Sequence, residues 1–506
     1  MTILCSNKPF PNDKYRASEL RSFAEITIRE CHLSFGMSEM SIWAQPNEPH
    51  LVYYKYPIIG HTIDYHKEST KFIKECHEKY GEIFSLYVFG QIITIVGGEL
   101  SPEIFKNHKE FSFNAAIDEF FPLHGFMGRP REFLSGLTTI VQRNLSGDLK
   151  FYTNRVQGQL LKSIDEIIGD GKVLQPPLKS LQLLVAKPVA AAVAEEFTDD
   201  KELINSFAYS VNDISSFLSF PPILHFISPK LHQKFLITFF RIANNPFVDH
   251  RETIKRKITP VVKKRLSEMK KLDGAYTPPV DILQNFIDMF GDDIDSITDY
   301  IISLIFAAVH TTSTSLNSIL QEFVNNPQFH EELLEEQKQL FKSKENDYYT
   351  IEQISKLERL DSMVRETFRL YVGASTLPHK VLSPYYTFSS GHQVPKGRNV
   401  YIRVKEIHND DKIHGQNSKE FNAFRHLESK SPASRVEKNF LTFGFGKHAC
   451  PGRFFAVNEI KIALHYLLLK YDIRKVGDEK INPLMKRNPT FPSVEGLLFE
   501  KRKSII

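Results

Sequence analysis

A single cysteine near the C-terminus lies in a loop that could present its sulfur to a metal. Cys450 is part of the segment LTFGFGKHACPGRFF, which carries three glycines and precedes an apolar helical pattern. Gly444 and Gly446 allow backbone conformations that residues with a side chain avoid, so the loop can approach a flat ligand closely. The helix that starts near Pro451 directs free N–H groups at the sulfur and favours its ionised form. The segment therefore predicts a metal-binding thiolate, and the alternative is a buried free cysteine in a glycine turn.

The spacing F-x-x-G-x-H-x-C-x-G in this segment resembles the haem-binding signature of the cytochrome P-450 family, especially of its fungal members. The resemblance implies that Cys450 binds the iron of haem b, and a thiolate ligand favours cleavage of the O–O bond. His448 would donate to a carboxylate at the edge of the haem. The signature residues that would hold the cofactor are Phe443, Gly444, Gly446, His448, Cys450 and Gly452.

The resemblance implies two further contacts to the haem carboxylates. His379, in the segment STLPHKVL, matches a strand position at which relatives place an Arg or His against a propionate. Arg143, in IVQRNLS, lies where the third helix of the family supplies another cation, although the Trp usual in that helix is missing. For Arg143 the alternative is a solvated side chain.

The segment SITDYIISLIFAAVHTTSTSLNSILQEFVNNP predicts a long central helix, because its first half is apolar nearly all round. Polar groups midway along such a helix are costly unless they are paired or used. The hydroxyl of Thr311 can bond to the carbonyl one turn earlier, which would bend the helix and open a groove. By resemblance, Thr311 takes the place of the alcohol that relays protons in the family.

His310 and Ala308 are departures from the family motif, which has an acid and a Gly at these places. Imidazole titrates near neutral pH, so His310 is a candidate proton relay. The alternative is a hydrogen-bonded core histidine. Sterol demethylases and several fungal terpenoid oxidases of the family carry the same H-T pair, and we therefore favour a sterol or terpenoid substrate.

The segment LDSMVRETFRLY places Glu366 and Arg369 three residues apart on one face of a helix. The family joins such a pair to an Arg from a later segment, which here is Arg425 in FNAFRHL. This cluster would be held by charge-assisted, bidentate bonds and would fix geometry, because breaking it leaves a buried charge unpaired. A solvated pair on a surface helix is the alternative.

The composition restricts which binding partners and which cellular compartment we expect for this protein. The net charge of +4 over 506 residues argues against nucleic acid as a partner. The four cysteines show neither zinc-type spacing nor a disulfide framework, which favours a reducing compartment or a cytosol-facing surface. Residues 1–45 read as an irregular N-terminal segment without a signal peptide or the roughly 20 apolar residues that span a bilayer. By resemblance the protein lies on the cytosolic face of the endoplasmic reticulum, and the cytoplasm is the alternative because no anchor is visible.

Helical patterns dominate the rest of the chain, with short alternating strands at 83–96 and after 370. We expect a mainly α protein with the cytochrome P-450 fold, in which residues 46–506 form one large helical domain with small β-sheets at one side. The segment SFPPILHFISPK at 219–230 predicts a loop between helices. In the family this region covers the substrate channel and often touches a membrane; an ordinary loop is the alternative.

Taken together, the motifs imply a haem-dependent monooxygenase that inserts one atom of O₂ into an apolar substrate. An NADPH-fed cytochrome reductase would supply the electrons, with cytochrome b5 as a second candidate donor. Two alternatives stay open. One is a haem–thiolate isomerase or dehydratase that needs no reductase, and the other is a non-catalytic haem- or lipid-binding protein.

Overall fold

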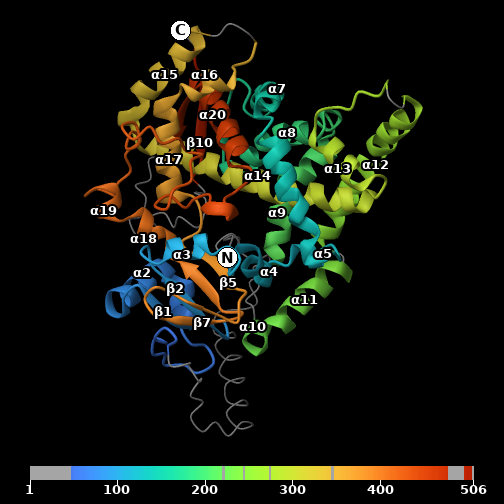
Figure 1. Ribbon diagram of the computed structural model, residues 1–506. Helices are drawn as coiled ribbons and strands as arrows, with labels where there is room; N and C mark the ends of the chain where they lie inside the picture. The colour runs from blue at the N-terminus through green and yellow to red at the C-terminus, as the bar shows by residue number, and fades with distance from the viewer. Residues whose placement is uncertain are drawn as a thin grey trace, which may run out of the picture.

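The computed structural model describes residues 47–218, 223–242, 245–272, 275–343, 347–476 and 495–503. The N-terminal segment 1–45 lies outside these residues. The described part is mainly helical, with small β-sheets at one side, which confirms the predicted fold class (Figure 1). Its α-helices are α2 (Thr62–Tyr80), α3 (Ser101–Lys106), α4 (Phe113–Phe120), α5 (Leu123–Phe126), α6 (Ser135–Ile140), α7 (Leu149–Ile167), α8 (Pro177–Val193), α9 (Lys201–Leu218), α10 (Ile223–Ile227), α11 (Pro229–Ile242), α12 (Pro246–Leu272), α13 (Ile282–Phe290), α14 (Ile294–Asn325), α15 (His330–Lys342), α16 (Ile351–Ser355), α17 (Glu358–Tyr371), α18 (Val404–His408), α19 (Asp411–His414) and α20 (Arg453–Lys470).

Helix α14 is the centre of the helical part, as its apolar sequence predicts. It contacts α8, α9, α12, α13, α17 and α20, and most of its side chains are buried. The carboxylate of Asp293 caps its first turn by accepting a hydrogen bond from the N–H of Ser296 at 3.0 Å. Of the helices in the described residues, only α14 is long and apolar enough to cross a bilayer, and it lies in the protein core instead.

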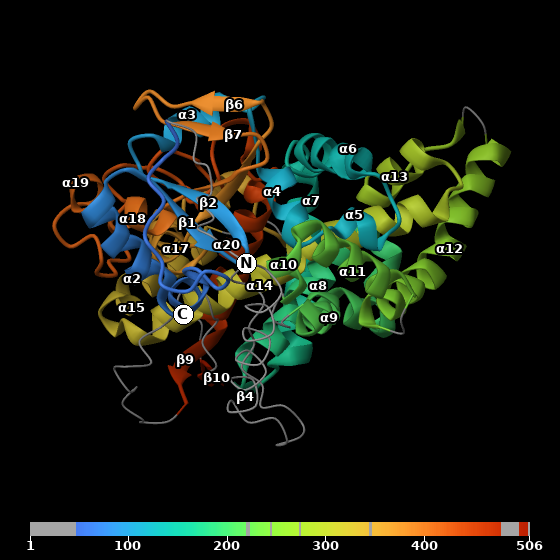
Figure 2. The ribbon, with the colours of Figure 1, turned by 90° about the horizontal axis from the view of Figure 1, so that it is seen from below.

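A five-stranded sheet forms the side of the molecule away from α12 and α13 (Figure 2). The order is β1-β2-β8-β5-β3, and all neighbours are antiparallel except β2 and β8. The turn between β1 and β2 has positive φ at Phe89 and Gly90, the conformation that a two-residue hairpin requires. The bounds are β1 (Ile83–Val88), β2 (Gln91–Val96), β3 (Phe111–Ser112), β5 (Leu377–Val381) and β8 (Asn399–Ile402).

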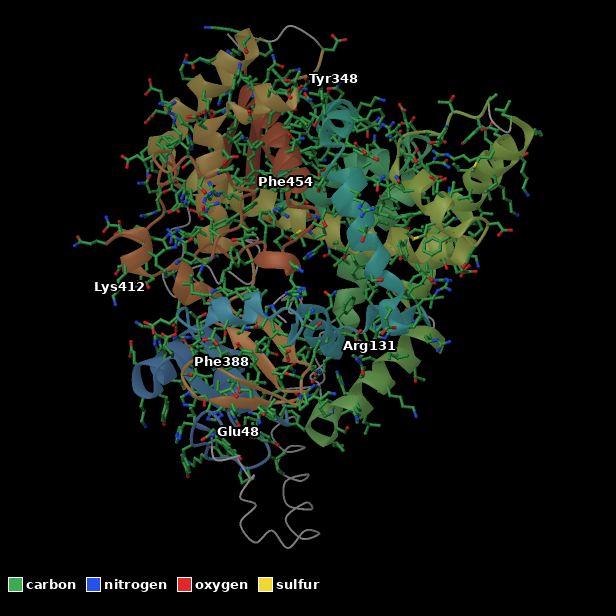
Figure 3. The ribbon with its side chains drawn as sticks, viewed as in Figure 1. Glu48, Arg131, Tyr348, Phe388, Lys412 and Phe454 are labelled. Atoms are coloured by element: carbon green, nitrogen blue, oxygen red, sulfur yellow. The ribbon has the colours of Figure 1, made fainter. Side chains whose placement is uncertain are left out.

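Successive side chains of β1 point to opposite faces of this sheet and enter two separate cores. Ile83 packs with Phe388, which lies among the strands in Figure 3, whereas Phe84 packs with Tyr401 on the other face. Two smaller sheets complete the strands of the described residues. They have the order β4-β10-β9 and β6-β7, with bounds β4 (Gly171–Leu174), β6 (Tyr385–Thr387), β7 (Gln393–Pro395), β9 (Tyr471–Lys475) and β10 (Leu497–Lys501).

One sequence-based expectation about the fold is wrong. The segment 219–230 was expected to form a loop, but its described residues form α10 and the start of α11. Helix α10 is held against the β1–β2 turn, where the ring Nδ1 of His225 lies 2.6 Å from the carbonyl oxygen of Phe89. This contact between segments far apart in the sequence stabilises a helix that the local pattern of prolines did not predict.

Candidate functional site

The loop that carries Cys450, residues 441–452, is closed on itself by its backbone, and we call it the cysteine loop. Gly444 and Gly446 have φ values of +71° and +67°, a region in which a side chain is strained. The N–H of Cys450 donates to the carbonyl of Phe443 at 2.8 Å, which returns the cysteine to the start of the loop. The turn therefore requires glycine at both positions. The ring of Phe443 packs edge-on against Phe368 of α17, 5.4 Å between centroids.

Gly452 is different from the other two glycines of the loop. It caps α20 with a φ of −88°, and a side chain there would first contact Val141 at an ordinary 3.7 Å. Neighbouring Pro451 accepts a hydrogen bond at its carbonyl from the hydroxyl of Ser146 at 2.6 Å. The stretch 141–146 therefore flanks the cysteine loop, but nothing in the local geometry demands glycine at 452.

The balance of forces on the Cys450 thiol differs from the sequence-based expectation. Burial raises the pKa of Cys450, and the N–H groups of Gly452 and Arg453 and the charge of Arg453 lower it by less. The start of α20 therefore does not ionise the thiol by itself. A bound metal cation would remove the proton, because a coordinating thiol is deprotonated. The side chain of Arg453 donates to the carbonyl of Cys450 at 2.8 Å and stiffens this end of the loop.

Two residues in the middle of the buried helix α14 are exposed. Ala307 and Thr311 face open space, whereas Val309 and Thr312, on other sides of the helix, are 0% and 4% exposed. The hydroxyl of Thr311 donates to the carbonyl of Ala307 at 2.6 Å, the back-bond anticipated from the sequence, and the helix stays continuous there. Because α14 runs through the interior, this exposed face lines an internal space.

His310 lies beside Thr311 on the same helix. Burial lowers the pKa of His310 to about 4, so its ring is neutral near pH 7. A neutral imidazole still has one donor and one acceptor nitrogen. His310 can therefore pass a proton from one nitrogen to the other, but it does not hold a charge at neutral pH.

Two histidines, the buried His379 and the half-buried His448, lie close together at the cysteine loop. The ring centroids of His379 and His448 are 6.4 Å apart, and His379 is 1% exposed. Nδ1 of His379 and Nε2 of His448 are buried and make no hydrogen bond to any described residue. Burial, and to a smaller extent the neighbouring His448, lowers the pKa of His379 to about 4. Unpaired ring nitrogens on two neighbouring histidines are a fitting partner for the carboxylates of a bound ligand.

These features fit a haem. Connected elements of the fold carry the parts that a haem needs. They are one sulfur, an internal space beside an exposed threonine, a glycine loop that permits close approach, and unpaired histidine nitrogens. The described residues contain no group of three or more His, Cys, Asp or Glu that could hold a metal ion alone. A metal at Cys450 would therefore take its other ligands from a macrocycle rather than from the chain.

Arg143, the remaining predicted contact, lies in the short π-helix Val141–Leu145. This segment flanks the cysteine loop, but the side chain of Arg143 is exposed. The structure therefore places the residue near the site without a direct contact to the other predicted residues.

Glu366 of α17 is the centre of a buried ionic cluster. Arg369 donates to both carboxylate oxygens at 2.8 Å, and Nε of Arg425 donates to one of them at 2.9 Å. Nε2 of His426 lies 3.1 Å from the other oxygen. Burial raises the pKa of Glu366, but the hydrogen bonds from Arg369, His426 and Arg425 outweigh it and hold the pKa at about 2. The carboxylate is therefore ionised at every physiological pH.

His408 at the end of α18 is a site-supporting residue that the sequence did not reveal. Its Nε2 accepts a hydrogen bond from the N–H of Leu441 at 2.8 Å, and its Nδ1 lies 2.9 Å from the carbonyl of Arg369. It therefore joins the ionic cluster to the first residue of the cysteine loop. His426 was missed as well. No spacing signal marks either histidine, and the only hint for His426 was its place next to Arg425.

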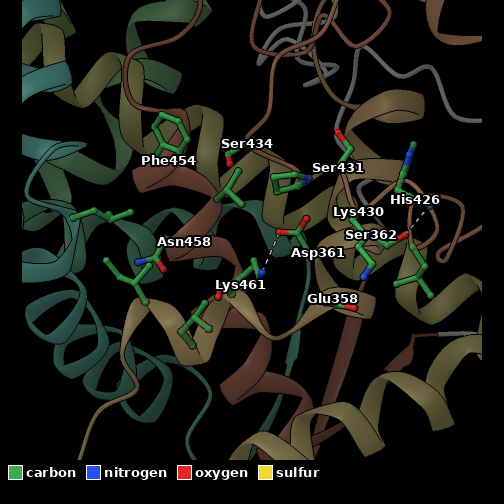
Figure 4. Close-up of a pocket in the computed structure, with 17 residues that line it drawn as sticks. Glu358, Asp361, Ser362, His426, Lys430, Ser431, Ser434, Phe454, Asn458 and Lys461 are labelled. Carbon is green, nitrogen blue, oxygen red and sulfur yellow. Dashed lines mark hydrogen bonds and ion pairs between the residues drawn. The ribbon is translucent and has the colours of Figure 1, made fainter.

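A pocket of about 290 Å³ opens beside the start of α20. Phe454 and Lys430 lie at opposite sides of it, and the ion pair between Lys461 and Asp361 lies between them (Figure 4). Five cations lie in or near the cysteine loop: Lys430, Arg435, Lys438, Lys447 and Arg453. Arg435 pairs with Glu437 at 3.3 Å but is 61% exposed at its side chain.

Comparison with known proteins gives a consistent result. The sequence model of the cytochrome P-450 family matches residues 49–498. Cytochrome P-450 monooxygenase 71 of Postia placenta is 31% identical over 261 residues, 49% of this chain and 51% of the relative. Cytochrome P-450 monooxygenase olcJ of Penicillium canescens is 30% identical over 236 residues, 44% and 43% of the two chains. Cytochrome P-450 monooxygenase ORF5 of Penicillium roqueforti is 23% identical over 377 residues, 68% of each. The alignment spans about half the length of the first of these relatives.

Proposed function

The chain belongs to the cytochrome P-450 family, and we propose that it is a haem-dependent monooxygenase acting on an apolar substrate. The observation that carries the proposal is that α20, which directly follows the glycine-closed loop of Cys450, packs against α14, whose exposed face holds Thr311. Oxygen activation needs a sulfur that binds the iron and an alcohol that delivers protons. Here the two lie on different elements of one core. The names of the relatives, which are monooxygenases, support the same reaction class.

Haem b would be held by residues of three elements. Cys450 would bind the iron, Phe443, Gly444 and Gly446 would shape the loop against the ring, and His448 and His379 would donate to the carboxylates. Arg143 would add a cation from the flanking π-helix. When bound, the haem would activate O₂ so that one oxygen atom enters a C–H bond of the substrate.

Thr311 would hold and deliver protons on the substrate side. Its hydroxyl already donates to Ala307, so its oxygen lone pairs face the internal space and can accept from a water there. His310, neutral near pH 7, would exchange protons through its two ring nitrogens. The apolar lining of this part of the core, with Phe306 and Ala308, would exclude bulk water and favour a sterol or terpenoid.

Electrons would come from an NADPH-fed cytochrome reductase, with cytochrome b5 as a second donor. The exposed cations near the cysteine loop suit an acidic partner, and charge complementarity mainly raises the rate of encounter. This surface lies beside the sulfur ligand, so it offers a short route for electrons.

A membrane surface would be the second contact. Ile227, Leu231 and Phe235, four residues apart along α10 and α11, are 72%, 43% and 53% exposed. Residues 223–242 contain two lysines and one arginine but no Asp or Glu. An exposed apolar stripe with flanking cations and no acids suits an anionic lipid surface. This supports a place on the cytosolic face of the endoplasmic reticulum.

Two other functions are less well supported. An isomerase or dehydratase of the same family needs neither reductase nor proton delivery, and the exposed hydroxyl of Thr311 on a buried helix speaks for proton delivery. A non-catalytic haem- or lipid-binding protein would need no exposed alcohol on a buried helix.

The test is the absorption spectrum of the reduced protein with CO, together with turnover assays. Thiolate ligation gives a band distinct from that of histidine ligation, and we expect Cys450→Ser to lose both this band and oxygenase activity. Product formed equally with and without NADPH and reductase would instead favour the isomerase.

A further inference from the structure

The pocket of about 290 Å³ beside the start of α20 is separate from the site of the proposed reaction. Its lining comes from the start of α7, from α16, from the starts of α17 and α20, and from the loop 426–434 (Figure 4). None of the described residues that we assign to the haem or to the proton path lines it. We call it the α20 pocket and ask which ligand its lining suits.

The walls of the α20 pocket are apolar. Ile354 and Val457 are buried in them, whereas Phe454 at the rim is 41% exposed. Contact with such walls favours an apolar skeleton, because apolar surface is then removed from water. A water molecule in the liquid takes up about 30 Å³, so the volume suits a ligand of about ten non-hydrogen atoms. The apolar lining consists of Leu149, Ile351, Ile354, Leu427, Phe454 and Val457.

One ion pair supplies the most deeply buried polar groups of the α20 pocket. Nζ of Lys461 donates to Oδ1 of Asp361 at 3.0 Å, and the two side chains are 5% and 14% exposed. Oδ2 of Asp361 accepts from the N–H of Ala433 at 2.7 Å. An ammonium group has three donors, and a carboxylate has about four acceptor positions. Both groups therefore keep hydrogen-bonding capacity that no described residue uses.

The charges that line the α20 pocket cancel. Asp361 and Glu358 are acidic, and Lys461 and Lys430 are basic. Burial lowers the pKa of His426 from its usual 6.5, so this ring is neutral near pH 7. A charged ligand would bring a charge that the pocket leaves unpaired, and an unpaired charge is costly away from water. The lining therefore suits a polar group that is uncharged.

We propose that the α20 pocket binds a small apolar molecule that carries one hydroxyl group. A hydroxyl is uncharged, and it can donate to Asp361 while it accepts from Lys461. A carboxylate in its place would be repelled by Asp361, and an ammonium group would be repelled by Lys461. A plain hydrocarbon would displace water from the ion pair without replacing its hydrogen bonds. The hydrocarbon part of the ligand lies against the apolar walls.

A ligand in the α20 pocket contacts both of the elements that support the cysteine loop. The hydroxyl of Ser362 accepts from the N–H of His426 at 3.0 Å, and Nε2 of His426 lies 3.1 Å from Glu366 of the ionic cluster. Phe454 and Val457 belong to the first turns of α20, which follows the cysteine loop. The product of the proposed reaction is itself an apolar molecule with a new hydroxyl group. The product is thus a ligand of this class, and this identification, unlike the preference of the pocket, rests on the proposed function.

Isothermal titration calorimetry on the haem-loaded protein tests the preference for a hydroxyl group. Clotrimazole, a bulky azole, is added first to occupy the iron and the space beside it, and the shift of the haem absorption band reports its binding. Geraniol, an alcohol of about the right size, is then compared with myrcene, a hydrocarbon with the same carbon skeleton, and with geranic acid. We expect geraniol to bind about tenfold or more tightly than either, the factor of one hydrogen bond to a charged group. Equal affinities for the three probes would overturn the proposal.

Two variants change the α20 pocket in different ways. Ser434→Trp places a large ring in it from a half-buried lining residue, labelled in Figure 4, and geraniol should then bind at least about tenfold more weakly. Gln416→Trp, at an exposed residue outside the lining, is the matched control and should keep the affinity of the parent. Asp361→Leu/Lys461→Met replaces the ion pair by apolar side chains, a change that is often neutral for stability. In this double variant geraniol and myrcene should bind within about threefold of each other.

Each result decides between the α20 pocket and another site. Geraniol that binds Ser434→Trp as tightly as the parent binds elsewhere, and that result overturns the proposal. A double variant with a parent-like urea midpoint that still prefers geraniol by the factor of the parent overturns it as well. If the double variant does not fold, the comparison of Ser434→Trp with Gln416→Trp decides. A protein that binds neither haem nor clotrimazole contradicts the proposed function instead, and the same pair of variants, titrated without clotrimazole, then tests the pocket.

Discussion

The N–H of Leu441 donates to Nε2 of His408 at 2.8 Å, and this bond links the ionic cluster around Glu366 to the cysteine loop. Since Nε2 accepts, the ring proton lies on Nδ1, which donates to the carbonyl of Arg369 at 2.9 Å. The carbonyl of Leu441 in turn accepts from the N–H of Gly444 at 2.9 Å. The first residue of the loop is therefore held through one tautomer of one histidine.

His408→Leu should destabilise the protein and loosen the cysteine loop. It leaves the N–H of Leu441 and the carbonyl of Arg369 buried without partners, at about 1–3 kcal/mol each. Urea unfolding should show a loss on the order of 2–4 kcal/mol, and the CO band should shift towards the form without thiolate. The exposed His66→Leu is the control and should change neither quantity. An intact band and parent-like stability in His408→Leu would show that the link is dispensable.

The same histidine predicts the sign of a pH effect. Burial, followed by the nearby charges of Lys405, His414 and Arg369, lowers the pKa of His408 well below 6.5, while the backbone bond to Arg369 acts in the opposite direction. Below about pH 6.5 the ring of His408 binds a proton in the unfolded chain but stays neutral in the folded protein. The stability from this group is therefore present above pH 6.5 and lost at about 1.4 kcal/mol per pH unit as the pH falls. His408→Leu should reduce this slope by about one proton, and an unchanged slope would contradict the assignment.

Glu366→Gln should be among the most damaging substitutions in the chain. It leaves the buried guanidinium of Arg369 and the neighbouring Arg425 without their carboxylate, at about 3–5 kcal/mol. Haem content after purification and the urea midpoint are the measurements. Glu332→Gln removes an exposed carboxylate that pairs with Arg359 at 3.2 Å, and this control should change stability by less than about 1 kcal/mol. Similar effects of the two substitutions would overturn the view that burial makes the cluster important.

Thr311→Ala should keep the haem but uncouple NADPH oxidation from product formation. Without the hydroxyl the proton path on the substrate side is weakened, so NADPH oxidation should yield peroxide or water, and product per NADPH should fall about tenfold or more. Thr298→Ala is a matched control, because its buried hydroxyl makes the same back-bond at 2.7 Å elsewhere on α14. Parent-like coupling in Thr311→Ala would leave the threonine a packing residue. His310→Ala, measured in the same assay, tests the relay.

The electron donor should dock on the cations beside the cysteine loop. Changing Lys430, Arg435 and Lys438 together to Glu should slow reduction by the reductase at low salt, and the difference should shrink as salt screens the charges. Substrate binding should stay unchanged. The control reverses three exposed lysines on the distant helix α12, Lys263, Lys270 and Lys271. Equal reduction rates of the two triple variants at low salt would remove this surface as the docking site.

Much of the site could be predicted because its signals are local. The glycine positions of the cysteine loop follow from φ values that only glycine adopts freely. The spacing of Glu366 and Arg369 places them on one helical face whatever surrounds them. The back-bond of Thr311 also depends only on its own helix. Short-range backbone geometry was sufficient for each of these.

The tertiary structure decided everything that depends on which distant segments meet. His408 reaches Leu441 across 33 residues, and no periodicity marks it. Contacting phenylalanine rings join α14, the end of α4, α5 and α11, and in the sequence these phenylalanines look like ordinary core. Burial outweighs the helix start in setting the pKa of Cys450, and helix α10 forms where the prolines predicted a loop. Desolvation and packing depend on the whole fold, whereas the sequence displays only what a residue does with its near neighbours.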